Sequence, residues 1–128
     1  MAFKISSALE GSYKWPVKVA IPIDGGKWHT QTFTGSFRRL PRAESKELVS
    51  LMGEMQRALD NGQSIEDVPD GSDVVRRVLT GWADIKDDDG EDLPFNGTNL
   101  ERLLEVGPFV NGVMKAYFES LDPAKEKN

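Results

Sequence analysis

The strongest constraint on the fold is an alternation of residue types near the N-terminus. Apolar side chains stand at Val17, Val19, Ile21 and Ile23, separated by Lys18, Ala20 and Pro22. This period of two is typical of a strand with one buried face. Asp24-Gly25-Gly26 then favours a tight turn, and residues 28–37, rich in Thr and aromatic side chains, suit a return strand. The sequence therefore predicts a β-hairpin, and Pro22, which cannot donate a ladder hydrogen bond, places its first strand at a sheet edge.

Helical spacing of apolar residues follows the hairpin. Leu48, Leu51, Met52, Met55 and Leu59 recur every three to four positions with charged residues between them. Pro41 suits a first turn and Asn61-Gly62 a C-terminal cap, so we expect a helix over residues 42–60. Residues 64–67 predict a short helical turn. Ser72 is the expected N-cap of a helix to about Leu79, which would bury Val74, Val75, Val78 and Leu79.

The C-terminal part predicts two more helices. Thr98 and Glu101 match a capping box, in which each side chain satisfies the backbone N–H of the other. They open a short helix with Leu100, Leu103 and Leu104 on its apolar side, which ends at Val106-Gly107-Pro108. Pro108 opens the last helix, whose expected inward residues are Phe109, Val110, Val113, Met114, Tyr117, Phe118 and Leu121. Residues 82–95 predict a loop or a small irregular hairpin, because their acidic centre must turn.

These elements predict one α+β domain over residues 14–121, with an N-terminal β-hairpin followed by a small bundle of about four helices. A chain of 128 residues suits one domain. We expect residues 1–13 to be a flexible N-terminal segment and residues 122–128 to be a disordered polar tail.

Composition argues against several classes of function. The net charge of −5 disfavours nucleic acid and anionic membranes as partners. The short basic cluster over residues 38–42 is best explained as a solvated corner between strand and helix. The chain has no cysteine, which excludes thiol catalysis and Cys-ligated zinc. With no signal-peptide pattern and no apolar run long enough for a membrane span, we expect a cytosolic protein.

The motifs that carry chemistry are also missing. Aligning Gly90 with the invariant glycine of an EF-hand loop places Ile85 and Asn96 where calcium needs carboxylates, so a solvated turn is favoured. His29 is the single histidine and has no partner near it in sequence for acid–base catalysis. The glycines match no phosphate-binding spacing. We therefore expect no enzyme, no catalytic residue, no metal site and no cofactor.

Binding to other proteins is the remaining class of function. Three tryptophans in a small domain are many, and aromatic residues are enriched in interface hot spots. Each tryptophan could equally belong to the core. The candidate partner-binding residues are Trp15, Trp28, Trp82, Phe95, Tyr117 and Phe118. We expect a groove between the hairpin and the last two helices, with Trp82 and Phe95 contacting the partner there.

Two blocks of the chain resemble the tail assembly chaperones of lambda-like and HK97-like siphophages. The first runs from Trp15-Pro16-Val17-Lys18-Val19 through Asp24-Gly25-Gly26 and Phe33 to Phe37-Arg38-Arg39-Leu40 and Glu44. The second contains Leu79-Thr80-Gly81-Trp82, Asp89-Gly90, Leu93-Pro94-Phe95, Leu100, Leu103-Leu104 and Ala116-Tyr117-Phe118. The order and spacing of these pieces, rather than any one of them, carry the resemblance.

The resemblance implies a protein of the host cytoplasm, encoded by a phage or prophage, that is absent from the finished virion. Its implied partners are the tape measure protein, which it keeps soluble, further copies of itself, and the tail tube protein. The resemblance also implies a longer form made by a −1 ribosomal frameshift, which would recruit the tube protein. Glu126-Lys127-Asn128 can be encoded by a slippery heptamer. The alternatives are a structural tail or head–tail connection protein retained in the virion, and a cytosolic adaptor or inhibitor without a phage role.

Overall fold

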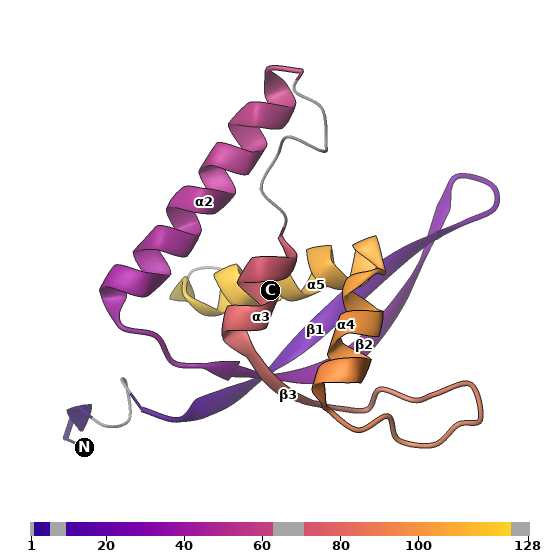
Figure 1. The fold of residues 1–128 in the computed structure, drawn as a ribbon, viewed down its shortest axis with the longest axis horizontal. Coiled ribbons are helices and arrows are strands. Elements are labelled where there is room, and N and C mark those ends of the chain that lie inside the picture. The colour runs from indigo at the N-terminus through magenta and orange to yellow at the C-terminus, as the bar shows by residue number, and fades with distance from the viewer. Residues whose placement is uncertain (1, 6–9, 63–70, 124–128) are drawn as a thin grey trace.

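The computed structural model describes residues 2–5, 10–62 and 71–123. The helical turn expected at 64–67 and most of the expected polar tail lie outside these residues. Within them, the elements in order are β1 (Ser12–Ile23), β2 (Lys27–Arg38), α2 (Arg42–Asp60), α3 (Ser72–Val78), β3 (Leu79–Ala83), α4 (Gly97–Leu104) and α5 (Gly107–Ser120) (Figure 1). The α+β class, the hairpin and the helix over residues 42–60 are confirmed.

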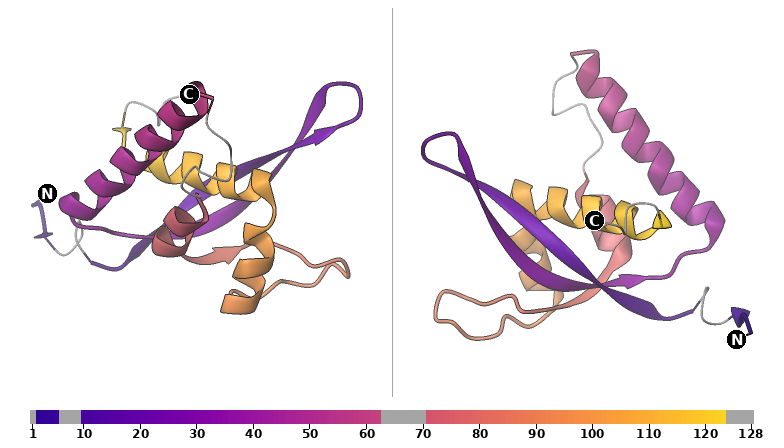
Figure 2. Two further views of the ribbon diagram at one scale, coloured as in Figure 1. Left: turned by 45° about the horizontal axis from the view of Figure 1, so that its top comes forward. Right: turned by 180° about the vertical axis from the view of Figure 1, so that it is seen from behind.

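The hairpin is a long antiparallel ribbon. Its register pairs Val17 with Phe33 and Pro22 with Trp28. Gly25 and Gly26 have φ angles of +85° and +74°, which glycine adopts without the steric cost that a Cβ imposes. The strand order is β1-β2-β3, so β1 lies at an edge, as Pro22 predicts. The end of the ribbon at residues 23–27 stands clear of the helices in each view (Figures 1 and 2).

A third strand corrects the predicted order of hairpin and then helices. Residues 79–83 form β3, which pairs antiparallel with β2 and places Leu79 opposite Phe37. The pairing shifts register between Ser36 and Phe37. Five residues carry too little alternation to reveal a strand, and this one forms because β2 presents an edge of backbone donors and acceptors that need partners. The segment expected as a loop or irregular hairpin therefore begins as a sheet strand.

The core lies between α5 and one face of the hairpin. The buried apolar side chains are Val17, Val19, Phe33, Phe37, Leu48, Val74, Val75, Val78, Leu79, Leu104, Phe109, Val110, Val113, Met114, Ala116 and Tyr117. Phe33 stacks on Phe109 with ring centroids 5.6 Å apart, and Phe37 meets Tyr117 edge-on at the same distance. The expected burial of the apolar side chains of α3 and of most of those on α5 is confirmed, although Leu121 is 43% exposed.

The helices do not form the expected bundle. α5 packs on the sheet, and α2 projects from the body at an angle (Figures 1 and 2). Among the described side chains of α2, Leu48 alone is fully buried, at 1% exposure. The reason is that β3 returns the chain to the sheet, so the sheet rather than the other helices supplies the surface that buries α5.

Two helix starts also differ from the prediction. The Asn96 side chain accepts a hydrogen bond from the Asn99 N–H at 2.8 Å and is the N-cap of α4. The capping box predicted from Thr98 and Glu101 is wrong, because Glu101 binds Arg76 of α3 instead. At α3 the N-cap position belongs to Gly71, one residue before the predicted Ser72.

Candidate binding surfaces

The structure separates the six aromatic residues expected at a binding surface. Trp28 is 66% exposed and Phe95 is 37% exposed, whereas Tyr117 is 1% exposed. Trp15, Trp82 and Phe118 are half-buried against the core. We therefore assign Tyr117 to the core, where it meets Phe37, and not to a surface that a partner can reach.

Trp82 organises the segment that follows β3. Its indole Nε1–H donates to the Leu93 carbonyl with an N···O distance of 2.7 Å. Its ring meets Phe95 edge-on at 4.8 Å and Phe109 at 6.4 Å. These contacts attach residues 84–96 to the core, so Trp82 has a structural role and Phe95 is the more exposed part of this cluster.

The acidic segment is an ordered turn. The Asp87 Oδ1 atom accepts from the backbone N–H groups of Asp89 and Glu91 at 2.9 and 3.0 Å. Lys86 forms an ion pair with Asp92 across the turn. The Asp87 carboxylate is therefore hydrogen-bonded to the backbone of its own turn, and this agrees with the solvated turn expected from the sequence. Within the described residues, no group of three His, Asp or Glu side chains is arranged to hold a metal ion.

The groove expected between the hairpin and the last two helices is closed. α5 lies directly on β1, and Gly112 faces the Lys18 carbonyl at close range. The hydroxyl groups of Tyr13 in β1 and Ser120 in α5 are hydrogen-bonded at 2.7 Å. These contacts leave no groove between α5 and β1.

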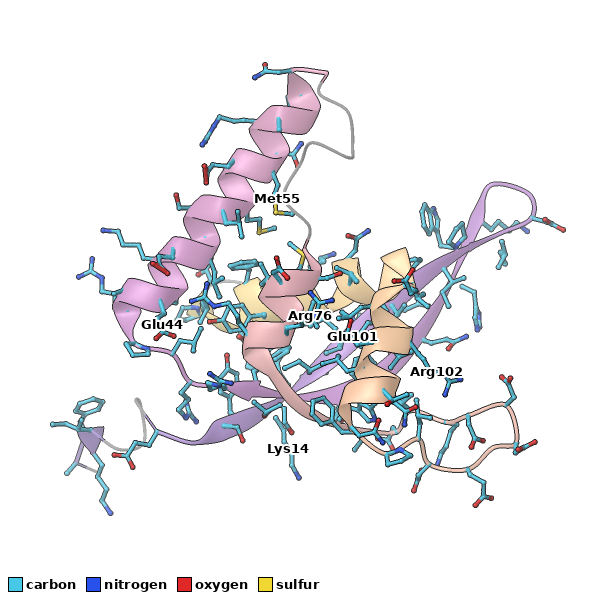
Figure 3. All side chains as sticks on the ribbon, in the orientation of Figure 1. Lys14, Glu44, Met55, Arg76, Glu101 and Arg102 are labelled. Carbon is cyan, nitrogen blue, oxygen red and sulfur yellow. The ribbon has the colours of Figure 1, made fainter. Side chains whose placement is uncertain are left out.

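A cavity of about 380 Å³ lies instead between α2 and the other helices. We call it the α2 groove. Its lining residues are Met55, Gly71, Ser72, Arg76, Leu104, Glu105, Gly107, Val110, Asn111 and Met114. Figure 3 shows the Met55 side chain on the side of α2 that faces α3 and α5. Flexible thioether side chains such as Met55 and Met114 can adapt to different apolar partners.

Two further apolar side chains of α2 are exposed. Val49 is 51% exposed and Met52 is 38% exposed. Amphipathic spacing of this kind normally indicates a helix whose apolar side is buried in its own domain. Here α2 projects from the body and part of that side stays uncovered. The sequence signal was therefore visible as periodicity, but only the position of α2 shows that Met52 of this stripe is exposed, whereas Leu48 is buried and Leu51 and Met55 are half-buried.

One basic and one acidic residue, Arg76 and Glu105, line the α2 groove. Arg76 forms two hydrogen bonds to the Glu101 carboxylate, each 2.8 Å long, and one to Asp73 at 2.7 Å. Figure 3 shows Arg76 and Glu101 reaching toward each other between α3 and α4. The hydrogen bond and positive charge of Arg76 lower the pKa of Glu101. Glu105 also lines the cavity and has no ion-pair partner among the described residues, whereas Asp73 and Glu101 lie outside the lining and are paired with Arg76.

The end of the hairpin forms a second exposed apolar surface. We call residues 23–28 the hairpin tip. Ile23 is 50% exposed and Trp28 is 66% exposed, and Lys27 lies between them in sequence. The tip has no helix against it in any view (Figures 1 and 2). Trp28 was expected at a binding surface, whereas Ile23 was expected on the buried face of the strand.

The comparisons with known proteins give one match. A family model described as "Phage tail assembly chaperone" matches residues 1–128. No curated protein and no solved structure matches the chain. Among the described residues, no helix is long and apolar enough to cross a membrane.

Proposed function

Because the chain belongs to the phage tail assembly chaperone family, we propose that it binds the tape measure protein, keeps it soluble and promotes assembly of the tail tube around it. The protein then acts by binding and not by catalysis, in the cytoplasm of the host. The longer, frameshifted form expected from the C-terminal codons would bring in the tail tube protein. Self-association of the free protein is part of the same proposal.

The α2 groove with its exposed stripe is the observation that supports this function best. Met55, Met114 and Leu104 line the groove, and Val49 and Met52 are exposed apolar residues on the same helix as Met55. An amphipathic helix places its apolar side into a groove of this kind through residues spaced three to four apart. A long helical client such as a tape measure protein offers many segments of that type.

The ordered surroundings of the groove support a binding role. The bidentate contact between Arg76 and Glu101 holds α3 to α4, and Val110 and Met114 belong to the buried side of α5. These elements keep one wall of the groove in place before a client arrives. A preformed wall reduces the conformational entropy lost on binding.

Co-expression with the tape measure protein tests the proposal. The test variant combines Val49→Ser with Met52→Ser, and the matched control combines Ala43→Ser with Lys46→Ser on another exposed part of α2. We expect the test variant to bind the tape measure protein at least tenfold more weakly and to lower its soluble fraction, as loss of interface anchors does.

The control variant should behave like the unchanged chain in both measurements. Circular dichroism shows whether each variant keeps its helix content. A folded test variant that keeps the tape measure protein soluble at the unchanged level would remove the exposed apolar residues Val49 and Met52 from the proposal.

A further inference from the structure

Three asparagines of the chain are followed directly by glycine, at residues 61–62, 96–97 and 111–112. Such pairs can lose ammonia without an enzyme, because the backbone nitrogen of the glycine can attack the asparagine side chain and no Cβ hinders its approach. The reaction requires a backbone that can rotate, a glycine N–H that is not hydrogen-bonded, and an asparagine side chain that is free to turn. The three pairs share one local sequence and differ in these structural requirements.

The pair Asn111-Gly112 lies inside α5. Within an α-helix the backbone N–H groups donate to the carbonyl four residues earlier, and this fixes the backbone rotation at both residues. Gly112 is also buried and faces the Lys18 carbonyl at close range. Attack by the Gly112 nitrogen would require α5 to open locally against the sheet, so this pair is protected.

The pair Asn96-Gly97 is held by a helix cap. The Oδ1 atom of Asn96 accepts from the Asn99 N–H at 2.8 Å, which makes Asn96 the N-cap of α4. The side chain would have to leave this hydrogen bond before its Cγ atom could turn toward the Gly97 nitrogen. The cap therefore protects Asn96 as long as α4 is formed.

The pair Asn61-Gly62 follows the last residue of α2, at the end of the helix that projects from the body (Figure 1). Both residues are exposed, and Gly62 has a φ angle of +78°. The Asn61 N–H donates to the Arg57 carbonyl at 3.0 Å. Within the described parts of the chain, no hydrogen bond engages the Asn61 side chain or the Gly62 N–H. Of the three pairs, this one meets all the requirements.

We propose that Asn61 is a site of spontaneous deamidation in the folded protein, and that Asn96 and Asn111 are protected. After a base from solvent removes the Gly62 amide proton, the Gly62 nitrogen attacks the Cγ atom of Asn61. The new N–Cγ bond closes a succinimide ring, the Cγ–Nδ2 bond breaks, and the side-chain nitrogen takes up a proton and leaves as ammonia. Water then opens the ring at either carbonyl, which gives aspartate or isoaspartate. This reaction does not depend on the function proposed above.

The modification changes the C-terminal end of α2. Either product carries a negative charge beside Asp60, where the carbonyl groups form the negative end of the helix dipole. Isoaspartate also adds a carbon atom to the backbone. Both changes disfavour the last turn of α2, the helix that carries Met55 of the α2 groove.

Incubation of the full chain at mildly alkaline pH, followed by trypsin digestion and mass spectrometry, tests the proposal. Trypsin places the three pairs on separate peptides, residues 58–76, 87–102 and 103–115. Asn61 should exchange its side-chain amide for a carboxyl group at least about tenfold faster than the other two, because opening a packed helix costs more free energy than motion of a helix end. Both aspartate and isoaspartate peptides should form, and chromatography separates them.

The same chain in urea is the control, because unfolding removes the structural differences between the three pairs. In urea all three should react at similar rates. If Asn61 reacts no faster than Asn96 and Asn111 in the folded chain, or if its preference persists unchanged in urea, the assignment is overturned. Aspartate without isoaspartate would show direct hydrolysis and overturn the ring-closure step.

Two variants test the effect on α2. Asn61→Asp reproduces the charge of one product, whereas Asn61→Gln is neutral and disfavours ring closure because the ring would be larger. Hydrogen exchange in residues 57–60 should be faster in Asn61→Asp than in Asn61→Gln. Equal exchange in the two variants would overturn the expected effect on the helix end.

Discussion

Gly112 of α5 faces the backbone of β1 so closely that a Cβ atom at residue 112 would lie 2.5 Å from the Lys18 carbonyl oxygen. The same Cβ would lie 3.4 Å from the Cα of Val19. Backbone atoms cannot move aside as the end of a flexible side chain can. The direct contact of helix and hairpin, which fills the space expected for a groove, therefore depends on the absence of a side chain at one position.

Gly112→Ala should destabilise the fold. Replacing glycine by alanine in a helix normally raises the free energy of unfolding by about 0.5–1 kcal/mol. Overpacking against a fixed backbone lowers it by about 1–3 kcal/mol. We expect a net loss in the free energy of unfolding, measured by urea denaturation. Gly53→Ala in α2 is the control, because its Cβ would meet only the end of the Arg57 side chain, at 3.5 Å. Equal stability of both variants would contradict the close approach.

Trp82→Phe should loosen the segment after β3. Phenylalanine keeps an aromatic ring against Phe95 and Phe109 but removes the donor to the Leu93 carbonyl. Loss of one such hydrogen bond costs about 0.5–1.5 kcal/mol. Hydrogen exchange should accelerate in residues 84–96 and remain unchanged in β1. Uniform protection throughout the chain would show that the indole hydrogen bond does not hold this segment.

Asn96→Ala and Thr98→Ala distinguish two caps for α4. Asn96 accepts from the Asn99 N–H, so its replacement should lower stability by about 1 kcal/mol. The Thr98 side chain is exposed, and its replacement should change stability much less. Thermal unfolding of both variants, followed by circular dichroism, gives the comparison. A larger loss for Thr98→Ala would restore the capping box.

Alkaline pH should destabilise the protein through Tyr117. Burial raises the pKa of Tyr117 to about 12, above its ordinary value of 10. The unfolded chain therefore loses this proton at lower pH than the folded chain. The contribution of Tyr117 to stability is complete below about pH 10 and disappears as the pH rises to about 12, a change of about 2–3 kcal/mol. The measurement is the denaturant midpoint of unfolding between pH 9 and pH 12, for the unchanged chain and for Tyr117→Phe. Phenylalanine does not titrate, so the midpoint of the variant should fall less over this range.

Local patterns were sufficient for much of the fold. The alternation from Val17 to Ile23 predicts β1. The apolar spacing around Leu48 predicts a helix over residues 42–60, and α2 has these bounds in the structure. The candidate site was less predictable. Trp28 and Phe95 are exposed as a binding role requires, but Tyr117 is buried, and no sequence pattern distinguishes the two situations. Exposure depends on which other element lies above a side chain, and local periodicity does not contain that information.

The sequence by itself determined the two strands of the hairpin and the approximate positions of the four described helices, because period, turn glycines and prolines act within a few residues. Tertiary structure alone decided three further points. It joined residues 79–83 to β2 as a third strand, placed α5 directly on β1 at Gly112, and left Val49 and Met52 of α2 exposed. Each of these points depends on contacts between residues far apart in the chain. Such contacts are stabilised by burial and by backbone pairing between elements, and local conformational preference does not determine them.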